Sequence, residues 1–214
     1  MSMLVAEGLT HRFGSEIALD DVDLTLDAGE RVAVLGDNGA GKTTLLRILA
    51  TALRPTSGRL HIGGVDALRD RRRLRRHIGY VAHSLGLYPA LSTAENLEFF
   101  CDLHGVSHGR VYEALDVVGL QSMASRVASR LSRGMQQRLA IARAIVHEPR
   151  LLVLDEPDAS LGADAADVLE AVMRGRTVVF ATHDHALAGR LCSRNVVLKR
   201  GRSARATTRL RVVR

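Results

Sequence analysis

The segment Gly36–Thr44 carries the residue types that bind a phosphate group. Its glycines leave room for backbone N–H groups to converge on an anion, and Lys42 and Thr43 complete the pattern G-x-x-x-x-G-K-T. The apolar run Arg31–Leu35 precedes the segment and Leu45–Leu49 follows it, as a strand and a helix should. We expect Lys42 at the β- and γ-phosphates of a nucleotide and Thr43 in a Mg²⁺ shell. The residues predicted to bind the nucleotide here are Asn38, Gly39, Ala40, Gly41, Lys42, Thr43 and Thr44.

Acidic side chains follow a second apolar run, Leu151–Leu154, at Asp155 and Glu156. Ligands bind α/β sheets at the carboxyl ends of such strands. We predict that Asp155 holds Mg²⁺ and that Glu156 polarises the attacking water as a general base. A third run, Thr177–Phe180, leads to His183, which we expect to face the γ-phosphate. An isolated histidine is more often a cap or an exposed side chain, but the acids and the phosphate loop favour a catalytic His183.

Apolar runs without alternation predict parallel strands that are buried on both faces, and their alternation with helical stretches predicts an α/β fold. Residues 84–131 lack strand signals, so we expect an inserted helical subdomain. Within it, Ser92–Glu95 fits a capping box, and helices are predicted around 111–118 and 122–127. The helix after the phosphate loop should end near Leu53, before Pro55.

The net charge of +7 is concentrated in two places. Six arginines and one aspartate occupy 69–76, and seven basic residues without an acid occupy 199–214. Aromatic residues are only 3%, and none forms a stacking platform near either cluster, which argues against nucleic-acid binding. We expect a solvated helix face and a loose tail. No apolar run reaches the length of a membrane span, and no secretory signal is visible.

Over essentially its whole length the chain resembles the ATP-binding subunit of an ABC transporter. Besides the two nucleotide motifs, Leu131–Arg138 resembles the signature loop of that family, and the motifs follow in the family's order. The resemblance implies an α/β, ABC-type P-loop ATPase as one ATP-binding domain over 1–214. Its core would be largely parallel and RecA-like, with a small antiparallel β subdomain and the helical insertion. The family also implies that Phe13 stacks on adenine and that residue 83 senses the γ-phosphate. The signature-loop residues implied to contact the ATP of a second protomer are Ser132, Arg133, Gly134 and Met135.

Several residues depart from the family pattern. Arg133 and Met135 replace a glycine and the glutamine of the usual Leu-Ser-Gly-Gly-Gln, and Gly162 replaces an aspartate. His83 stands where glutamine is usual, and its imidazole could still bind Mg²⁺ through a water molecule or bind the lytic water. His83, the segment 87–89 and the signature loop resemble the haem-exporter ATPases of cytochrome c maturation.

The sequence therefore predicts an ATP- and Mg²⁺-dependent ATPase that powers a membrane exporter, with haem as the cargo. The alternatives are the ATPase of another small exporter and a low-turnover ATP-binding module that regulates a membrane complex. The expected partners are a second copy in an ATP-sandwich dimer and integral membrane subunits, with no nucleic acid. We expect a peripheral protein at the cytoplasmic face of a bacterial inner membrane.

Overall fold

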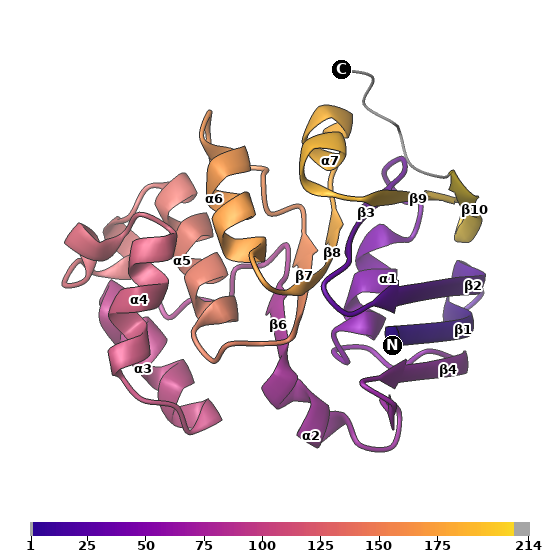
Figure 1. The fold of residues 1–214 in the computed structure, drawn as a ribbon, viewed down its shortest axis with the longest axis horizontal. Coiled ribbons are helices and arrows are strands. Elements are labelled where there is room, and N and C mark those ends of the chain that lie inside the picture. The colour runs from indigo at the N-terminus through magenta and orange to yellow at the C-terminus, as the bar shows by residue number, and fades with distance from the viewer. Residues whose placement is uncertain (1, 208–214) are drawn as a thin grey trace.

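The computed structural model describes residues 2–207, which form two β-sheets and the helices around them (Figure 1). One sheet is antiparallel, with the order β2-β1-β4-β5, and the other has the order β10-β9-β3-β8-β7-β6. In the second sheet every pairing is parallel except that of β10 with β9. The strands are β1 (Ser2–Phe13), β2 (Glu16–Asp27), β3 (Arg31–Leu35), β4 (Ser57–Ile62), β5 (Val65–Asp66), β6 (Ile78–Val81), β7 (Leu151–Asp155), β8 (Thr177–Ala181), β9 (Arg194–Lys199) and β10 (Arg202–Thr207).

The parallel sheet separates two hydrophobic cores, which confirms the predicted α/β fold. In β7, Leu151 and Val153 face the core shared with the antiparallel sheet, whereas Leu152 and Leu154 face the core shared with the helices. All four side chains are fully buried, which is why this strand reads as continuously apolar. The helices are α1 (Lys42–Leu49), α2 (Arg71–Leu74), α3 (Thr93–His104), α4 (Gly109–Val117), α5 (Arg133–Ile145), α6 (Ala165–Met173) and α7 (His185–Leu191).

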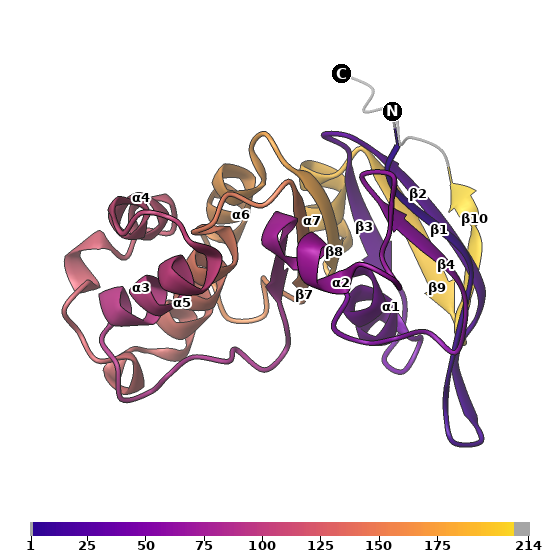
Figure 2. The same ribbon diagram turned by 90° about the horizontal axis from the view of Figure 1, so that it is seen from below.

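The insertion between β6 and α5 is helical, as predicted, and lies at the far side of the parallel sheet from the antiparallel one (Figures 1 and 2). The capping box is present at α3, where the Ser92 hydroxyl accepts from the Glu95 N–H and the Glu95 carboxylate accepts from the Ser92 N–H. The helix predicted at 122–127 was wrong. That stretch holds a 3₁₀ turn at Gln121–Met123 and then irregular chain, whose backbone bonds to the start of α3 through Ala124 O and Arg126 O.

Part of the arginine run is structural rather than solvated. α1 ends at Leu49 rather than near Leu53, and Thr51 then adopts a φ of 58°. The Thr51 carbonyl accepts hydrogen bonds from the guanidinium groups of both Arg71 and Arg75. Cations are favoured at a helix C-terminus, so these two arginines stabilise the end of the helix that begins at the phosphate loop.

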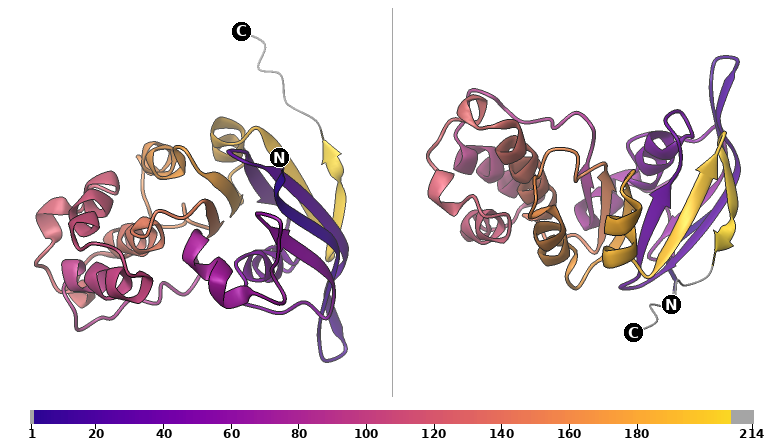
Figure 3. Two further views of the ribbon diagram at one scale, coloured as in Figure 1. Left: turned by 60° about the horizontal axis from the view of Figure 1, so that its bottom comes forward. Right: turned by 90° about the horizontal axis from the view of Figure 1, so that it is seen from above.

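The last strand that the structure describes, β10, lies beside β2 near the start of the chain (Figure 3). The turn between β9 and β10 places Gly201 against the phosphate loop: its N–H donates to Ala40 O at 3.0 Å, and its carbonyl accepts from the Asp20 N–H at 2.8 Å. The tail predicted to be loose is therefore a paired strand over Arg202–Thr207, and residues 208–214 lie outside the described part. Within that part, no helix is long and apolar enough to cross a bilayer.

Candidate nucleotide site

Three neighbouring parallel strands, β3, β8 and β7, deliver the predicted site residues to one edge of the sheet. β3 leads into the phosphate loop, β7 ends at Asp155, and β8 is followed by Thr182 and His183. Because the strands run in the same direction, their carboxyl ends meet, and side chains from Lys42 to His183 come within hydrogen-bond distance.

Two glycines of the phosphate loop are needed for packing within the protein, in addition to any role in binding an anion. A Cβ at Gly36 would lie 2.4 Å from Leu198 O, and one at Gly41 would lie 2.4 Å from Ala18 O. A Cβ at Gly39 would meet nothing within 4 Å. The expectation that each glycine mainly makes room for phosphate is thus too simple, since Gly36 and Gly41 allow the loop to pack against other strands of the fold.

The Lys42 ammonium lies at the centre of the site and is almost fully buried. It donates to the carbonyls of Gly36, at 2.8 Å, and Asp37, at 3.2 Å. Its Nζ is also 3.3 Å from His183 Nε2, which in turn is 3.0 Å from Glu156 Oε1. One imidazole nitrogen can accept from Lys42 or donate to Glu156 but not both, so His183 can support either partner according to its tautomer.

Thr43 and Asp155 provide the oxygen atoms that suit a hard cation. Thr43 Oγ1 donates to Asp155 Oδ1 at 3.2 Å, while Asp155 Oδ2 is buried and has no hydrogen-bond partner among the described residues. Burial raises the pKa of Asp155, and the hydrogen bond from Thr43 opposes that rise. A buried carboxylate oxygen without a partner fits Mg²⁺, which binds through one or two protein oxygens and substrate phosphates. The residues are therefore suited to the metal predicted from sequence.

His83 lies on the same side of the sheet, exposed, after β6. It lines a cavity of about 140 Å³ together with Asp155, Glu156 and Arg133. Its positive form is close enough to lower the pKa of Asp155, which supports a place near the metal-binding oxygens. The cavity also shows that Arg133 of the signature loop faces the acidic residues of its own chain.

The signature loop forms the N-terminus of α5. The Ser132 hydroxyl caps the helix by accepting from the Met135 N–H at 3.2 Å. A Cβ at Gly134 would lie 2.6 Å from Ser160 O, and Arg133 Nε donates to Ser160 Oγ at 3.4 Å. The loop is therefore packed on the segment that follows Glu156; Arg133 shares a cavity with Glu156, and no contact among the described residues joins the loop to Lys42 of the same chain.

Phe13 is the last residue of β1, which belongs to the antiparallel sheet and not to the sheet whose strands lead to Lys42, Asp155 and His183. Its ring is 48% exposed and makes an edge contact with the His11 ring, with centroids 4.5 Å apart. Asn38 and Gly39 are exposed at the tip of the phosphate loop, whereas Ala40 is buried beneath it, where its carbonyl accepts from Gly201. Thr44 lies half-buried on α1.

Sequence reasoning missed two side chains that hold the Glu156 turn. Gln137 Nε2, on α5, donates to Pro157 O at 3.1 Å, and Asp158 Oδ2 accepts from Thr182 Oγ1 at 2.9 Å. Gln137 lies within the signature segment Leu131–Arg138, but that motif does not show that its side chain bonds to the turn after Glu156. Asp158 is the next acid after Glu156 and could have been noticed, but its partner is 24 residues away in the chain.

A family model described as "ABC transporter" matches residues 19–159. The chain is 40% identical to the sulfate/thiosulfate import ATP-binding protein CysA of Bradyrhizobium diazoefficiens, over 91% of this chain and 60% of that protein. It is 39% identical to the spermidine/putrescine import ATP-binding protein PotA of Pseudomonas aeruginosa, over 94% of this chain and 58% of that one. It is also 39% identical to the Fe(3+) ions import ATP-binding protein FbpC of Streptomyces avermitilis, over 98% and 64%. The chain thus spans about three fifths of the length of these relatives.

Solved structures of ATP-binding cassettes have the same fold. A dimeric post-hydrolysis structure of the ATP-binding cassette MJ0796 bound to ADP and Pi has a TM-score of 0.89 and 30% identity, covering 99% of this chain and 100% of that one. A second dimeric structure of MJ0796, titled a bacterial ABC transporter cassette, has a TM-score of 0.89 and 31% identity over the same shares.

Proposed function

Because the chain belongs to the ABC transporter family, as an ATP-binding ATPase subunit, we propose that Lys42, Asp155, Glu156 and His183 carry out its ATP hydrolysis. The observation that carries this assignment is that His183 Nε2 lies 3.3 Å from Lys42 Nζ and 3.0 Å from Glu156 Oε1. On the same edge of the sheet, the buried Asp155 Oδ2 has no hydrogen-bond partner among the described residues. The phosphate loop binds the β- and γ-phosphates, and Lys42 exchanges its carbonyl partners for phosphate oxygens.

The remaining roles follow from position. Thr43 and Asp155 would hold Mg²⁺, which neutralises charge on the β- and γ-phosphates. Glu156 orients and polarises the attacking water, and His183 donates a hydrogen bond to Glu156 or stabilises the γ-phosphate. His83 is exposed, lines the same cavity as Asp155, and would hold the metal through a water molecule. Phe13 offers an exposed ring on which adenine can stack.

We propose further that two copies close on two ATP molecules. Ser132 and the N-terminus of α5 form an anion site that does not face Lys42 of the same chain, so it is suited to the nucleotide of a second copy. The titles of the similar MJ0796 structures describe dimers. Sedimentation of the Glu156→Gln variant tests this: we expect monomers without nucleotide and dimers with Mg-ATP. A dimer that forms without ATP, or none with it, contradicts the proposal.

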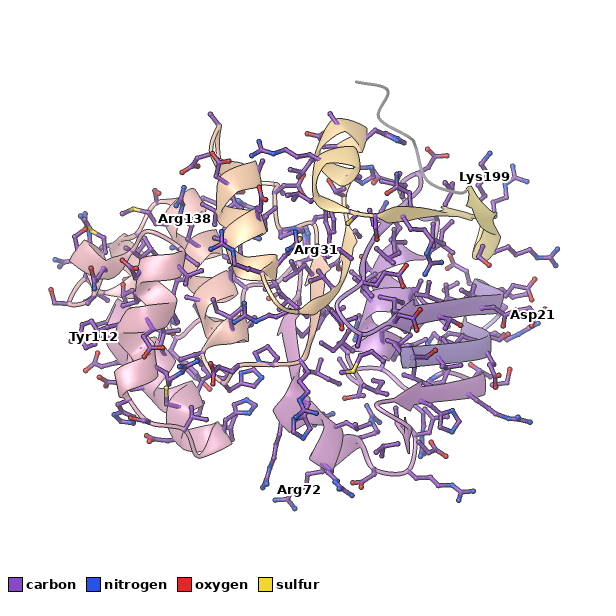
Figure 4. The ribbon with its side chains drawn as sticks, in the orientation of Figure 1. Asp21, Arg31, Arg72, Tyr112, Arg138 and Lys199 are labelled. Atoms are coloured by element: carbon purple, nitrogen blue, oxygen red, sulfur yellow. The ribbon has the colours of Figure 1, made fainter. Side chains whose placement is uncertain are left out.

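The surface proposed to bind a membrane subunit is a cavity of about 540 Å³, here called the Arg–His groove. Its rim continues into the exposed side chains of Tyr88, Phe99 and Leu103, and Arg143 links it to the segment after His83 by donating to Leu85 O at 2.6 Å. In Figure 4, Arg72 marks this side of the molecule. The residues lining the groove are Ala50, Ala52, Arg72, Arg75, Arg76, Ile78, Tyr80, Phe100, Leu103, His104, Arg143, Ala144 and His147.

The cargo proposed first is a small solute that is imported, in line with the names of the three relatives. Those names cover an anion, a polyamine and a metal ion at 39–40% identity, so similarity of the ATPase does not select among cargoes. We place the protein at the cytoplasmic face of a bacterial membrane, docked on its membrane subunits. Uptake of labelled sulfate, spermidine and Fe³⁺ by a strain with only the Glu156→Gln form, compared with its parent, tests import.

Haem export is the second candidate, and His83 with the signature segment Ser132–Met135 favours it. None of the three relatives named above is a haem exporter, so they lend this candidate no support. Haem staining of membrane fractions separates the two candidates. Loss of c-type cytochromes with normal solute uptake supports export, whereas normal cytochromes with impaired uptake supports import.

A further inference from the structure

The Glu156 side chain projects from a strained turn. Glu156 has a φ of 50°, a left-handed conformation that is unfavourable for a non-glycine residue and persists only where neighbouring structure enforces it. Two ties act on the backbone: the Glu156 N–H donates to Ala181 O at 3.0 Å, and Gln137 donates to Pro157 O. The orientation of the proposed general base therefore depends on what holds this turn.

Asp158 makes a third contact that holds this turn. It differs from the first two because it connects the turn to the segment that carries His183. Its Oδ2 accepts from Thr182 Oγ1 at 2.9 Å, and Thr182, the residue before His183, is fully buried. The same hydroxyl accepts from the Asp184 N–H at 3.0 Å, and the Asp184 carboxylate caps α7. One side chain thus joins the turn after β7 to the turn after β8.

We propose that Asp158 is a positioning residue for ATP hydrolysis, whose hydrogen bond to Thr182 holds Glu156 and His183 in register with each other. The proposal rests on the roles assigned above to Glu156 and His183. Asp158 makes no described contact with Lys42 or Thr43, so losing its hydrogen bond should slow the chemical step without weakening ATP binding.

The position needs a hydrogen-bond acceptor rather than a negative charge. Asp158 is half-buried, and its Oδ1 is buried without a hydrogen-bond partner in the described part of the chain. Burial raises the pKa of Asp158, the Thr182 hydrogen bond opposes that rise, and the neighbouring charges of Asp184 and Glu156 add to it. Asparagine keeps the acceptor oxygen, has the same shape, and removes a charge that two nearby carboxylates disfavour.

The test measures kcat and KM for Mg-ATP on the full chain. Asp158→Ala and Thr182→Val should each lower kcat about tenfold, the effect of one hydrogen bond in an enforced geometry, and leave KM within about twofold. Asp158→Asn and Thr182→Ser keep the bond and should stay within about threefold of the parental kcat. Asp167→Ala removes an exposed acid of α6 that bonds to Arg190, and serves as the matched control with parental kinetics.

The double variant Asp158→Ala/Thr182→Val should be no slower than either single variant, because both remove the same bond. Melting temperatures of all variants separate positioning from folding: Asp158→Ala should melt below Asp158→Asn because it loses the hydrogen bond, but both should be fully folded at the assay temperature and still differ in kcat. The proposal is overturned if Asp158→Ala keeps parental kcat, if asparagine is as slow as alanine, or if only KM changes. Absence of ATPase activity in the parent would instead contradict the proposed function.

Discussion

The nucleotide edge of the parallel sheet and the Arg–His groove differ in whether their charged side chains have partners of opposite charge nearby. At the nucleotide edge, the His183 ring lies 3.3 Å from the Lys42 ammonium and 3.0 Å from the Glu156 carboxylate. The groove holds four arginines and two histidines and has no carboxylate in its described lining. The first region has its counter-charges built in, whereas the second needs a negative or polar partner to balance it. The charges of the nucleotide edge are therefore balanced within the chain, and those of the groove are not.

The two regions are close enough to affect each other. Tyr80 lies on β6, in the wall of the groove, and burial, followed by the charge of Asp155, raises its pKa to about 12. The phenol therefore remains neutral at every physiological pH and can pack between the regions. Arg75 also contributes to both regions. It lines the groove, and it donates to the Thr51 carbonyl just after the end of α1, the helix that begins at the phosphate loop.

The largest expected effect is a loss of ATP hydrolysis on substitution of Glu156 at the nucleotide edge. Glu156→Gln should reduce ATP hydrolysis about 10²–10³-fold, because the amide cannot take up a proton from the attacking water. ATP affinity should remain at the parental value, as measured by equilibrium binding of a fluorescent ATP analogue. Hydrolysis at the parental rate would show that Glu156 is not the general base.

The next effect concerns how the phosphate loop is packed. Gly41→Ala should lower the free energy of unfolding by about 3 kcal/mol, because the new Cβ meets Ala18 O and the φ of 100° is strained for alanine. Gly39→Ala is the matched control, with a φ of 78° and open space, and should cost about 1 kcal/mol. Urea unfolding measures both. Equal losses would contradict a close packing of the loop against β2.

A charge reversal sharpens the contrast between the two regions. Arg76→Glu, in the groove, should weaken binding to the membrane partner about tenfold and leave the ATPase rate of the free chain within about twofold. Arg69→Glu belongs to the same arginine run but lies outside the groove and pairs with Asp66, so it should leave partner binding unchanged. Co-sedimentation with partner-containing membranes decides between them. A parallel loss in both variants points to general attraction to anionic lipid.

The smallest effect is a dependence of stability on pH. Burial, followed by the charge of His104, lowers the pKa of His147 to about 4, and their rings stack 3.9 Å apart. The unfolded chain takes up this proton below its ordinary pKa of about 6.5, while the folded chain resists until about pH 4, so stability falls across that window. We expect a loss of about 1 kcal/mol between pH 7 and pH 5, after allowing for partial exposure.

His147→Gln should reduce this pH dependence, because glutamine stays neutral, and His61→Gln on β4 should not. Thermal melting at pH 7 and pH 5 provides the measurement. An unchanged pH dependence in His147→Gln would show that the ring titrates alike in the folded and unfolded chain.

Sequence reasoning succeeded where the chemistry is local. Gly36–Thr44 and the acids after Leu154 lie within short segments, and the buried strands before them have a distinct composition. The α/β fold and the meeting of these segments at one edge of the sheet were therefore predictable, whereas the catalytic roles of their residues stay predictions. The Arg–His groove was not, because its lining comes from separate segments between Ala50 and His147. Arg71 and Arg75 were expected to be solvated, since nothing in the run shows that the Thr51 carbonyl lies beside it. Partners of this kind are fixed only by tertiary packing.

The hydrogen bond from Gly201 to Ala40 means that the packing of the phosphate loop is completed only late in synthesis of the chain. Residues 36–44 leave the ribosome long before β9 and its turn, an interval on the order of ten seconds at ordinary elongation rates. During that time the loop lacks the hydrogen bond from Gly201 and the close packing of Gly36 on Leu198. We therefore expect the loop to bind ATP only weakly before β9 and its turn have formed, and a truncation that removes β9 should weaken nucleotide binding although every residue of the phosphate loop is still present.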